Sequence, residues 1–386
     1  MYRRTLLGGA GALVLGGLVG CGSSSSGAES NAGGIATTIP LAAVLDLTGP
    51  VAHAGIGASR GAQLAIEEIN STAFLGDGVT IAYTEADSAG EIERASSEVT
   101  KAMANSDNMA ILGPVQGQQA AAVAPLAERQ KCPIWFTQAG ADGVVISDYT
   151  FRATAPMHTH YDIAMEHLAE QGKKKVALLY NATYPTLAGI GEVTAPEAAQ
   201  RLGIEITASV PVQSSTQDFA AVAGQLTEGQ PDAIWLLVLN TQGVTAVTQI
   251  TEAGYDGLFL GNTNMAGGNL LEAGDTGKGM LYPVDFSAGQ EDENAAKFTE
   301  AFEAEYGELP KAYSAEAYDG MWWMARGIKA AGDSSREGIQ RGMAQVAGEG
   351  FTGAMGNITF EGNDMRVPGV LVERDGEREH VLKSGS

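Results

Sequence analysis

Residues 109–137 read MAILGPVQGQQAAAVAPLAERQKCPIWFT, and this stretch decides the fold. It holds a short apolar run that Gly113-Pro114 ends, an Ala-rich segment over 117–130, and a second apolar run over 133–137. Two short apolar runs joined by a helix predict buried parallel strands with a right-handed crossover between them. A sheet of such strands needs helices on both faces, so the stretch predicts an α/β architecture.

The same alternation of strand and helix extends along the chain on both sides of this unit. Before it, the patterns predict strands over 39–46 and 79–83 and helices over 56–70 and 91–104. After it, the series starts again. The patterns predict strands over 175–180, 204–210, 233–239 and 258–260, and helices over 160–171, 186–202, 218–228 and 243–253. The last part predicts helices over 293–306, 314–331 and 336–346, and late strands near 357–360 and 369–373. Two such series in one chain predict two doubly wound lobes with parallel sheets.

Composition limits the classes of partner. The chain has 386 residues, of which 44% are hydrophobic, enough for two lobes with separate cores. Its net charge is -23, and about -25 after residue 20, because the first 20 residues hold two Arg and no acidic residue. Such a surface argues against nucleic acid or anionic lipid as the principal partner. The two Cys and five His lack metal-ligand spacing, so we expect neither a metal nor a cofactor.

The N-terminus predicts export and lipidation. Arg3 and Arg4 precede a stretch without charge over 6–20, which is too short and Gly-rich for a good membrane span. Leu18-Val19-Gly20-Cys21 matches a lipobox, in which the thiol is acylated after cleavage. We therefore expect a signal peptide over 1–20, a lipid on Cys21, and a flexible tether over 21–37 that is rich in Ser, Gly and Ala. The protein would be anchored to the cell membrane and face the periplasm or the cell exterior.

The loops after the predicted strands are the expected place for a ligand, because open parallel sheets bind ligands outside the carboxyl ends of their strands. These loops carry small, uncharged residues over 48–50, 113–117, 138–141, 181–186, 240–242 and 262–264. A helix that begins at Gly117 would aim unpaired backbone N–H groups at the ligand, which suits a carboxylate or another small anion. The alternative interpretation is that these residues only make turns.

A serine motif, a tryptophan pair and a cysteine each allow a functional interpretation beside a structural one. Gly57-Ala58-Ser59-Arg60-Gly61 fits the G-x-S-x-G pattern of an esterase nucleophile, but Ser59 falls inside a predicted helix about ten residues after the strand. A Ser59 esterase is therefore only a remote alternative. Trp322 and Trp323 either pack on a helix or form an aromatic wall for a ligand. Cys132 opens an apolar run and is expected to be a buried, inert side chain.

Several segments carry a likeness to a known family. They are LDLTGPVA over 45–52, GAQLAIEEIN over 61–70, ILGP over 111–114, FTQA over 136–139 and AYDG over 317–320. In this order they resemble type I periplasmic binding proteins of the leucine/isoleucine/valine-binding family, from about residue 38 to the end. The resemblance implies two lobes joined by three crossovers, which close on a small molecule without catalysis and deliver it to an ABC transporter permease. A monomer is expected.

The resemblance also implies how the chain divides. The first lobe would comprise 38–153 plus 284–352, and the second lobe 154–283 plus 353–386. A partner-bound sensor, which passes ligand occupancy to a signalling protein, is the alternative to transport.

The loops and the resemblance together nominate a set of ligand-binding residues. They are Gln116, Gly117, Ala139, Gly140, Tyr184, Asn240, Thr263 and Asp285. Thr263 is uncharged where the family has an acid that pairs with the ligand ammonium, and Ala141 stands where the family has a Thr. Asp285 could replace the missing acid. If it does not, the resemblance implies a neutral amide or an acid without an amine; otherwise the solute is similar to an amino acid.

Overall fold

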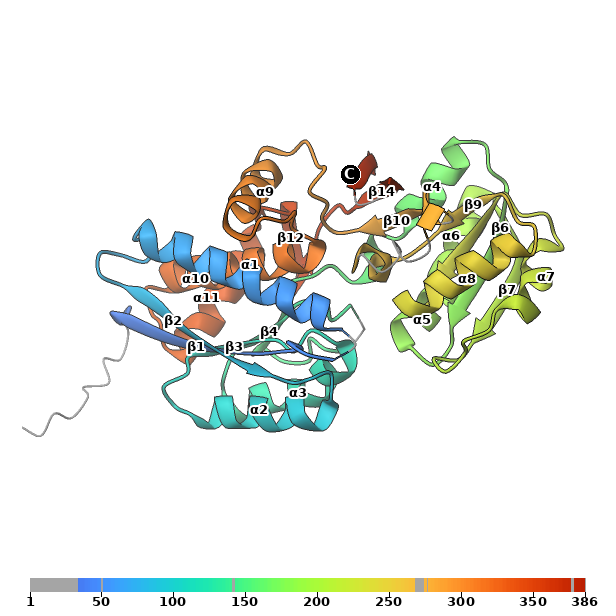
Figure 1. Ribbon diagram of the computed structural model, residues 1–386. Helices are drawn as coiled ribbons and strands as arrows, with labels where there is room; N and C mark the ends of the chain where they lie inside the picture. The colour runs from blue at the N-terminus through green and yellow to red at the C-terminus, as the bar shows by residue number, and fades with distance from the viewer. Residues whose placement is uncertain are drawn as a thin grey trace, which may run out of the picture. The chain divides into compact units, whose positions relative to one another are not determined.

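The computed structural model describes residues 34–49, 51–140, 143–267, 274–275, 277–375 and 378–385. They form two α/β lobes, each built on one sheet (Figure 1). The predicted signal peptide, Cys21 and most of the predicted tether lie outside the described residues. Within the described ranges, no helix combines the length and the apolar character that a membrane crossing needs.

The sheet of the first lobe has eight strands in the order β11-β12-β13-β5-β4-β3-β1-β2. Their bounds are Thr38–Leu45 (β1), Thr80–Asp87 (β2), Ala110–Leu112 (β3), Ile134–Phe136 (β4), Thr150–Arg152 (β5), Phe351–Gly353 (β11), Gly356–Glu361 (β12) and Asp364–Arg366 (β13). The strands from β2 to β13 are paired in parallel, whereas β12 pairs antiparallel with both β11 and β13. The strand order reverses between β1 and β3, so a ligand site is expected where their loops open.

Helices cover both faces of this sheet (Figure 1). One face carries α1 (Ala52–Ser71), α9 (Glu293–Tyr306), α10 (Ala312–Ala331) and α11 (Arg336–Glu349), and the other carries α2 (Ile92–Ala104) and α3 (Gly117–Gln130). Alternate residues of β1 explain the two layers, because successive strand side chains point to opposite faces. Ile39 and Leu41 belong to the first core, whereas Ala42 and Val44 belong to the second.

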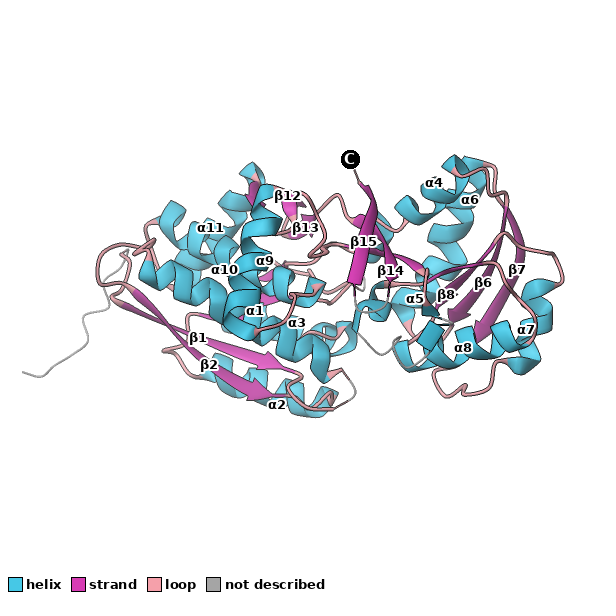
Figure 2. Cartoon of the chain, turned by 45° about the horizontal axis from the view of Figure 1, so that its top comes forward, coloured by secondary structure: helices cyan, strands magenta, loops and turns pink. Residues whose placement is uncertain are grey.

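The sheet of the second lobe has seven strands in the order β15-β14-β10-β9-β8-β6-β7. Their bounds are Lys175–Asn181 (β6), Glu205–Val212 (β7), Ala233–Leu237 (β8), Leu258–Leu260 (β9), Leu281–Val284 (β10), Val370–Asp375 (β14) and Arg378–Ser384 (β15). Helices α4 (Asp162–Glu170) and α6 (Ala195–Leu202) share one core with it, and α7 (Ala220–Thr227) and α8 (Asn240–Glu252) share another (Figure 2). The strand order reverses between β6 and β8.

Three segments connect the lobes: one after β5, one after β10, and residues 367–369 between β13 and β14. The third connection lies further along the chain than the predicted boundary between residues 352 and 353. The reason is that β13 pairs in parallel with β5, which places Asp364 opposite Arg152. The buried Arg152 guanidinium also binds the Asp364 carboxylate through two N–H groups, so β12 and β13 stay with the first sheet.

The helix predicted over 186–202, with a disruption at Pro196, is interrupted earlier in the chain. Helix α5 (Pro185–Gly189) passes into a π-helical turn over Ile190–Thr194, and α6 follows. Pro196 is the second residue of α6 and directly follows this π-helical turn, in which the Ala195 N–H donates to the Ile190 carbonyl. Strands β5, β10, β11, β13 and β15 were not predicted; β5, β11 and β13 are only three residues long and carry no clear alternation.

Candidate functional site

A pocket at the carboxyl ends of the strands of both sheets is the candidate binding site, and we call it the cleft pocket. It is lined by Val51, His53, Ala54, Val115, Gln116, Gly117, Gln138, Gly140, Met157, Tyr184, Thr186, Asn264 and Tyr313. Most of them follow β1, β3 and β4 in the first lobe and β6 and β9 in the second, whereas Met157 follows β5 and Tyr313 lies on α10. The pocket therefore lies where the doubly wound topology places ligands.

The start of helix α3 gives the cleft pocket its donor side. Gln116 is the N-cap residue and Gly117 the first helical residue, and no side chain caps the helix. The first N–H groups of a helix have no partner within it and carry partial positive charge, so they favour an anion. This end of the cleft pocket therefore suits a carboxylate.

A buried carboxylate fixes the Gln116 side chain. Asp46 directly follows β1, is fully buried, and accepts 2.9 Å hydrogen bonds from Nε2 of both Gln116 and Gln119. It also accepts from the Ser88 hydroxyl and, at 3.0 Å, from the Gly90 backbone N–H. Because Asp46 is held by these four donors, it orients the loop after β3 and places a negative charge beneath the pocket wall.

The remaining walls of the cleft pocket are aromatic and uncharged. The His53 ring lies edge-on to Tyr313, with 5.5 Å between centroids, and burial lowers the pKa of His53. From the second lobe comes Tyr184, whose pKa is raised by burial and by Asp46. Among the described residues, the cleft pocket has no Lys or Arg in its lining.

A second, smaller cavity adjoins the cleft pocket, and we call it the hinge cavity. It shares Gln138, Gly140 and Met157 with the cleft pocket, and its other lining residues are Thr154, Ala155, His160, Thr263, Asp285 and Glu316. Asp285 directly follows β10 and Thr154 follows β5, so two of the three lobe connections contribute to it. Burial lowers the pKa of His160 to about 4, which keeps its imidazole neutral.

Two carboxyl groups meet in the hinge cavity. Asp285 and Glu316 are 3% and 1% exposed, and burial raises the pKa of both. The nearby Asp285 raises the pKa of Glu316 further, because Glu316 hydrogen bonds to Asp285 in its protonated form. Asp285 Oδ1 and Glu316 Oε1 accept no hydrogen bond from an N–H or hydroxyl group of the described residues. A proton held on Glu316 therefore makes the hydrogen bond between the two carboxyl groups.

Neighbouring groups hold this pair in place. The Thr154 hydroxyl donates to Asp285 Oδ2 at 3.0 Å, and the Gln138 backbone N–H donates to Glu316 Oε2 at 2.6 Å. Gln138 adopts a φ of 54°, a left-handed conformation that costs a non-glycine residue of order 1 kcal/mol. Its side-chain Oε1 has no partner among the described residues and lines both cavities.

The structure divides the predicted site residues between the two cavities. Those in the cleft pocket are Gln116, Gly117, Gly140 and Tyr184, and those in the hinge cavity are Gly140, Thr263 and Asp285. Ala139 is buried and lines neither cavity; its carbonyl accepts from Arg152 Nη1 at 3.1 Å. Asn240 begins α8, but its side chain lies outside the described part, as does Ala141.

Sequence reasoning missed several lining residues. They are Val51, His53, Ala54, Val115, Gln138, Thr154, Ala155, Met157, His160, Thr186, Asn264, Tyr313 and Glu316. Gln138, Thr186 and Asn264 stand in the loops that the strand pattern had indicated, so the signal was present in the sequence. Tyr313 and Glu316 belong to α10, whose position against these loops depends on tertiary packing.

The other motifs have structural explanations. Ser59 lies inside α1, where its hydroxyl accepts from Gln63 Nε2 at 2.8 Å. The glycine of this motif at Gly61 allows α1 to approach α10, because a Cβ there would lie 2.0 Å from the Ser314 carbonyl oxygen. Cys132 is buried and burial raises the pKa of its thiol to about 11, so it is a poor nucleophile. Among the residues described, no group of His, Cys, Asp and Glu could hold a metal ion.

Two α/β lobes with a pocket at the carboxyl ends of both sheets define a two-lobed solute-binding protein. The chain belongs to the periplasmic binding protein family, whose model matches residues 38–370. This family works outside the cytoplasm. The relatives described next are binding proteins rather than enzymes, in agreement with the expectation that no reaction is catalysed.

Relatives of known name support this assignment. The chain is 24% identical over 328 residues to the leucine-, isoleucine-, valine-, threonine- and alanine-binding protein of Pseudomonas aeruginosa, covering 83% of this chain and 86% of that protein. It resembles the structure of the branched-chain amino acid transporter substrate-binding protein LivJ from Streptococcus pneumoniae with isoleucine, at 25% identity, a TM-score of 0.80, and coverage of 90% and 99%. The leucine-binding protein LivK from Thermotoga maritima gives 22% identity, a TM-score of 0.78, and the same coverage.

Proposed function

We propose that this chain is an exported lipoprotein that captures a small amino acid-like solute in the cleft pocket and delivers it to an ABC transporter permease. A lipid on Cys21 and a polar tether would keep the lobes close to the membrane. The relatives support the solute class, since the Pseudomonas aeruginosa protein is named for five amino acids and the Streptococcus pneumoniae structure holds isoleucine.

The observation that carries the proposal is the opposite polarity of the two ends of the site. The unpaired N–H groups at the start of α3 favour a carboxylate at the cleft pocket. The hinge cavity next to it offers oxygen acceptors from the Gln138 side chain and the Asp285 carboxylate, which suit an ammonium group. A zwitterionic amino acid has one group for each end.

The charges around the site argue against a plain carboxylic acid. No Lys or Arg among the described residues lines either cavity, and the acidic groups Asp46 and Asp285 lie beside them. A carboxylic acid without an amine would bring a negative charge close to these acidic groups, and no positive charge of the solute would offset the repulsion. Such an uncompensated charge is unfavourable in a buried site. Asp285 is thus suited to the role of the acid that is missing at Thr263.

A thermal-shift and calorimetric comparison of three matched solutes tests the proposal. We expect L-leucine to bind at one site without turnover, leucinamide to bind less well, and 4-methylpentanoate, which lacks the amine, to bind least. A solute at 100 times its Kd should raise the free energy of unfolding by about 2.7 kcal/mol. Valine, isoleucine, alanine and urea extend the panel if leucine is too large.

Variants of Tyr184 control for the position of the site. Tyr184→Ala should weaken binding by about 1–3 kcal/mol, whereas Tyr184→Phe keeps the ring and should change it less. If none of the amino acids, amides or acids stabilises the chain, the proposed function is wrong. Normal affinity in Tyr184→Ala would instead show that the solute binds elsewhere.

A further inference from the structure

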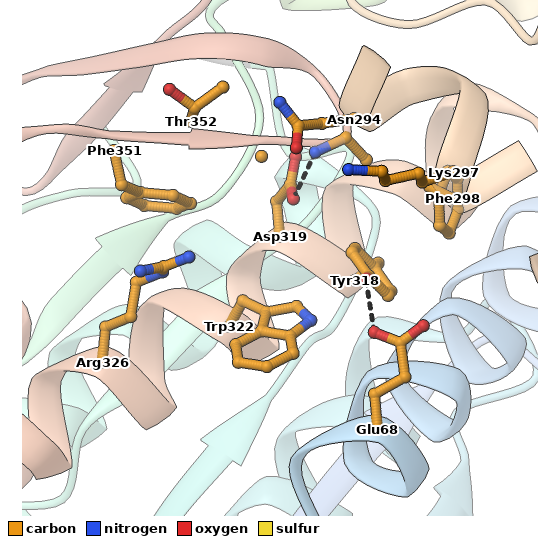
Figure 3. A pocket seen from close by; sticks show the side chains of 12 residues that line it. Glu68, Asn294, Lys297, Phe298, Tyr318, Asp319, Trp322, Arg326, Phe351 and Thr352 are labelled. Atoms are coloured by element: carbon orange, nitrogen blue, oxygen red, sulfur yellow. Dashed lines mark hydrogen bonds between the residues drawn. The ribbon is translucent and has the colours of Figure 1, made fainter. Parts of the chain in front are cut away.

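The two adjacent tryptophans of α10 have different surroundings. Trp323 is fully buried, and its Nε1 donates to the Met343 carbonyl at 2.9 Å. Trp322 is half-buried and lines a pocket that lies apart from the cleft pocket (Figure 3). We call it the α10 pocket, and it shares no lining residue with the cleft pocket or the hinge cavity.

The α10 pocket is enclosed by α1, α9, α10 and β11, all in the first lobe. Its lining residues are Glu68, Asn294, Lys297, Phe298, Tyr318, Asp319, Trp322, Arg326, Phe351, Thr352, Gly353 and Ala354. Four of these are aromatic, and the rings of Phe298 and Tyr318 lie 4.6 Å apart. The walls therefore suit a planar, apolar body.

Arg326 is the polar group of this pocket that lacks a partner. Its guanidinium lies over the rings of Trp322 and Phe351, with its central carbon 5.7 Å and 5.3 Å from their centroids. No carboxylate of the described residues lies within ion-pair distance of it, and its buried Nε has no acceptor. A guanidinium whose faces contact rings leaves the N–H groups at its edge for a carboxylate, which it can bind with two hydrogen bonds.

The acidic groups in the wall are already bound. Asp319 accepts 2.8 Å hydrogen bonds from the backbone N–H groups of Ala354 and Met355, and burial raises its pKa to about 7. Glu68 accepts from the Tyr318 hydroxyl. Lys297 extends from α9 at the rim, as Figure 3 shows, and its ammonium group is paired with the Glu293 carboxylate at 2.6 Å. The pocket therefore offers one cation without an ion pair to the described residues, the Arg326 guanidinium, beside aromatic rings.

We propose that the α10 pocket is a second binding site, which takes a small carboxylic acid with a planar apolar body. Its carboxylate pairs with the edge of Arg326, and its body lies against Trp322 and the neighbouring rings. The site is independent of the cleft pocket and of the solute bound there.

Phenylacetate and its uncharged isostere 2-phenylacetamide test this proposal on the wild-type chain. Of the four tryptophans, Trp322 lines the α10 pocket, whereas Trp135, Trp235 and Trp323 are fully buried and line none of the three cavities, so a ligand in the α10 pocket changes the emission through its contact with Trp322. We expect phenylacetate to change the emission with saturation. The amide should bind at least tenfold more weakly, because it cannot form the charged pair with Arg326.

Variants then locate the site. Arg326→Gln should weaken phenylacetate binding at least tenfold. The exposed Lys297→Gln removes a charge that Glu293 already pairs, so it should change the binding much less and is the matched control for the loss of one positive charge. Tyr184→Ala alters the cleft pocket alone and should leave the affinity unchanged. Equal binding of acid and amide, no saturable change, or loss of binding in Tyr184→Ala would each overturn the proposal. A calorimetric titration of Trp322→Phe should still show binding while the emission change disappears.

Discussion

Replacing Glu316 by Gln should stabilise the chain increasingly as the pH rises. In the folded state Glu316 is 1% exposed, lies beside Asp285 and has a pKa well above its usual range. In the unfolded chain it would titrate near pH 4.3. Between these two pKa values the folded state binds one more proton than the unfolded state, so the free energy of unfolding falls as the pH rises.

The magnitude follows from this one proton. A difference of one bound proton changes the free energy of unfolding by about 1.4 kcal/mol per pH unit. The glutamine of the Glu316→Gln variant cannot lose a proton, yet its amide can donate to Asp285 and its oxygen can accept from the Gln138 N–H, so the geometry is kept. The variant should therefore gain about 1.4 kcal/mol over the wild type for each pH unit between the unfolded and the folded pKa of Glu316.

Urea unfolding at a series of pH values measures the difference. At pH 4 the two proteins should be nearly equally stable, because Glu316 is mostly protonated in both states of the wild type. Glu300→Gln on the exposed side of α9 is the matched control for the loss of one negative charge from an acidic chain. A stability difference that does not change with pH would refute the reasoning, since it would mean that Glu316 holds no extra proton in the folded state.

The remaining predictions concern packing and anchoring. Gly61→Ala should lower the free energy of unfolding by about 2 kcal/mol, because its Cβ would lie 2.0 Å from the Ser314 oxygen, and urea unfolding measures this. Gly224→Ala on α7 is the control, because a Cβ there meets nothing within 4 Å, and it should raise the free energy of unfolding by about 0.5–1 kcal/mol. If it instead destabilised the chain as much as Gly61→Ala, the close approach of α1 to α10 would not be the reason for the effect at Gly61. Cys21→Ser should move the exported protein from the membrane fraction to the soluble extracytoplasmic fraction, and unchanged sedimentation with membranes would argue against the lipid anchor.

Most elements of the fold could be predicted because their signals are local. A buried strand such as β8 and an amphipathic helix such as α2 show their period within a few neighbouring residues. The short strands β5, β11 and β13 have three residues each, too few for a period to be visible. The lobe to which β13 belongs is set by Arg152 and Asp364, which are 212 residues apart in the chain.

The candidate site shows the same division. The loops after β3 and β6 were predicted from the strand pattern, and Gln116 and Tyr184 do line the cleft pocket. The partner of Asp285 was not predicted, because Glu316 is on a helix of the first lobe whereas Asp285 follows a strand of the second. Residues so far apart in the sequence give no sign of contact in a single chain.

The sequence by itself determined the α/β class, the two strand–helix series and the loops that would bind a ligand, because each depends on the order of nearby side chains. It also contains the lipobox at Cys21, a signal that is read in the extended chain. Only the tertiary structure decided which charges meet. It brought Asp285 and Glu316 together in the hinge cavity, and it left Arg326 with no described carboxylate within ion-pair distance in the α10 pocket. Long-range packing, not local periodicity, decides which distant side chains become neighbours.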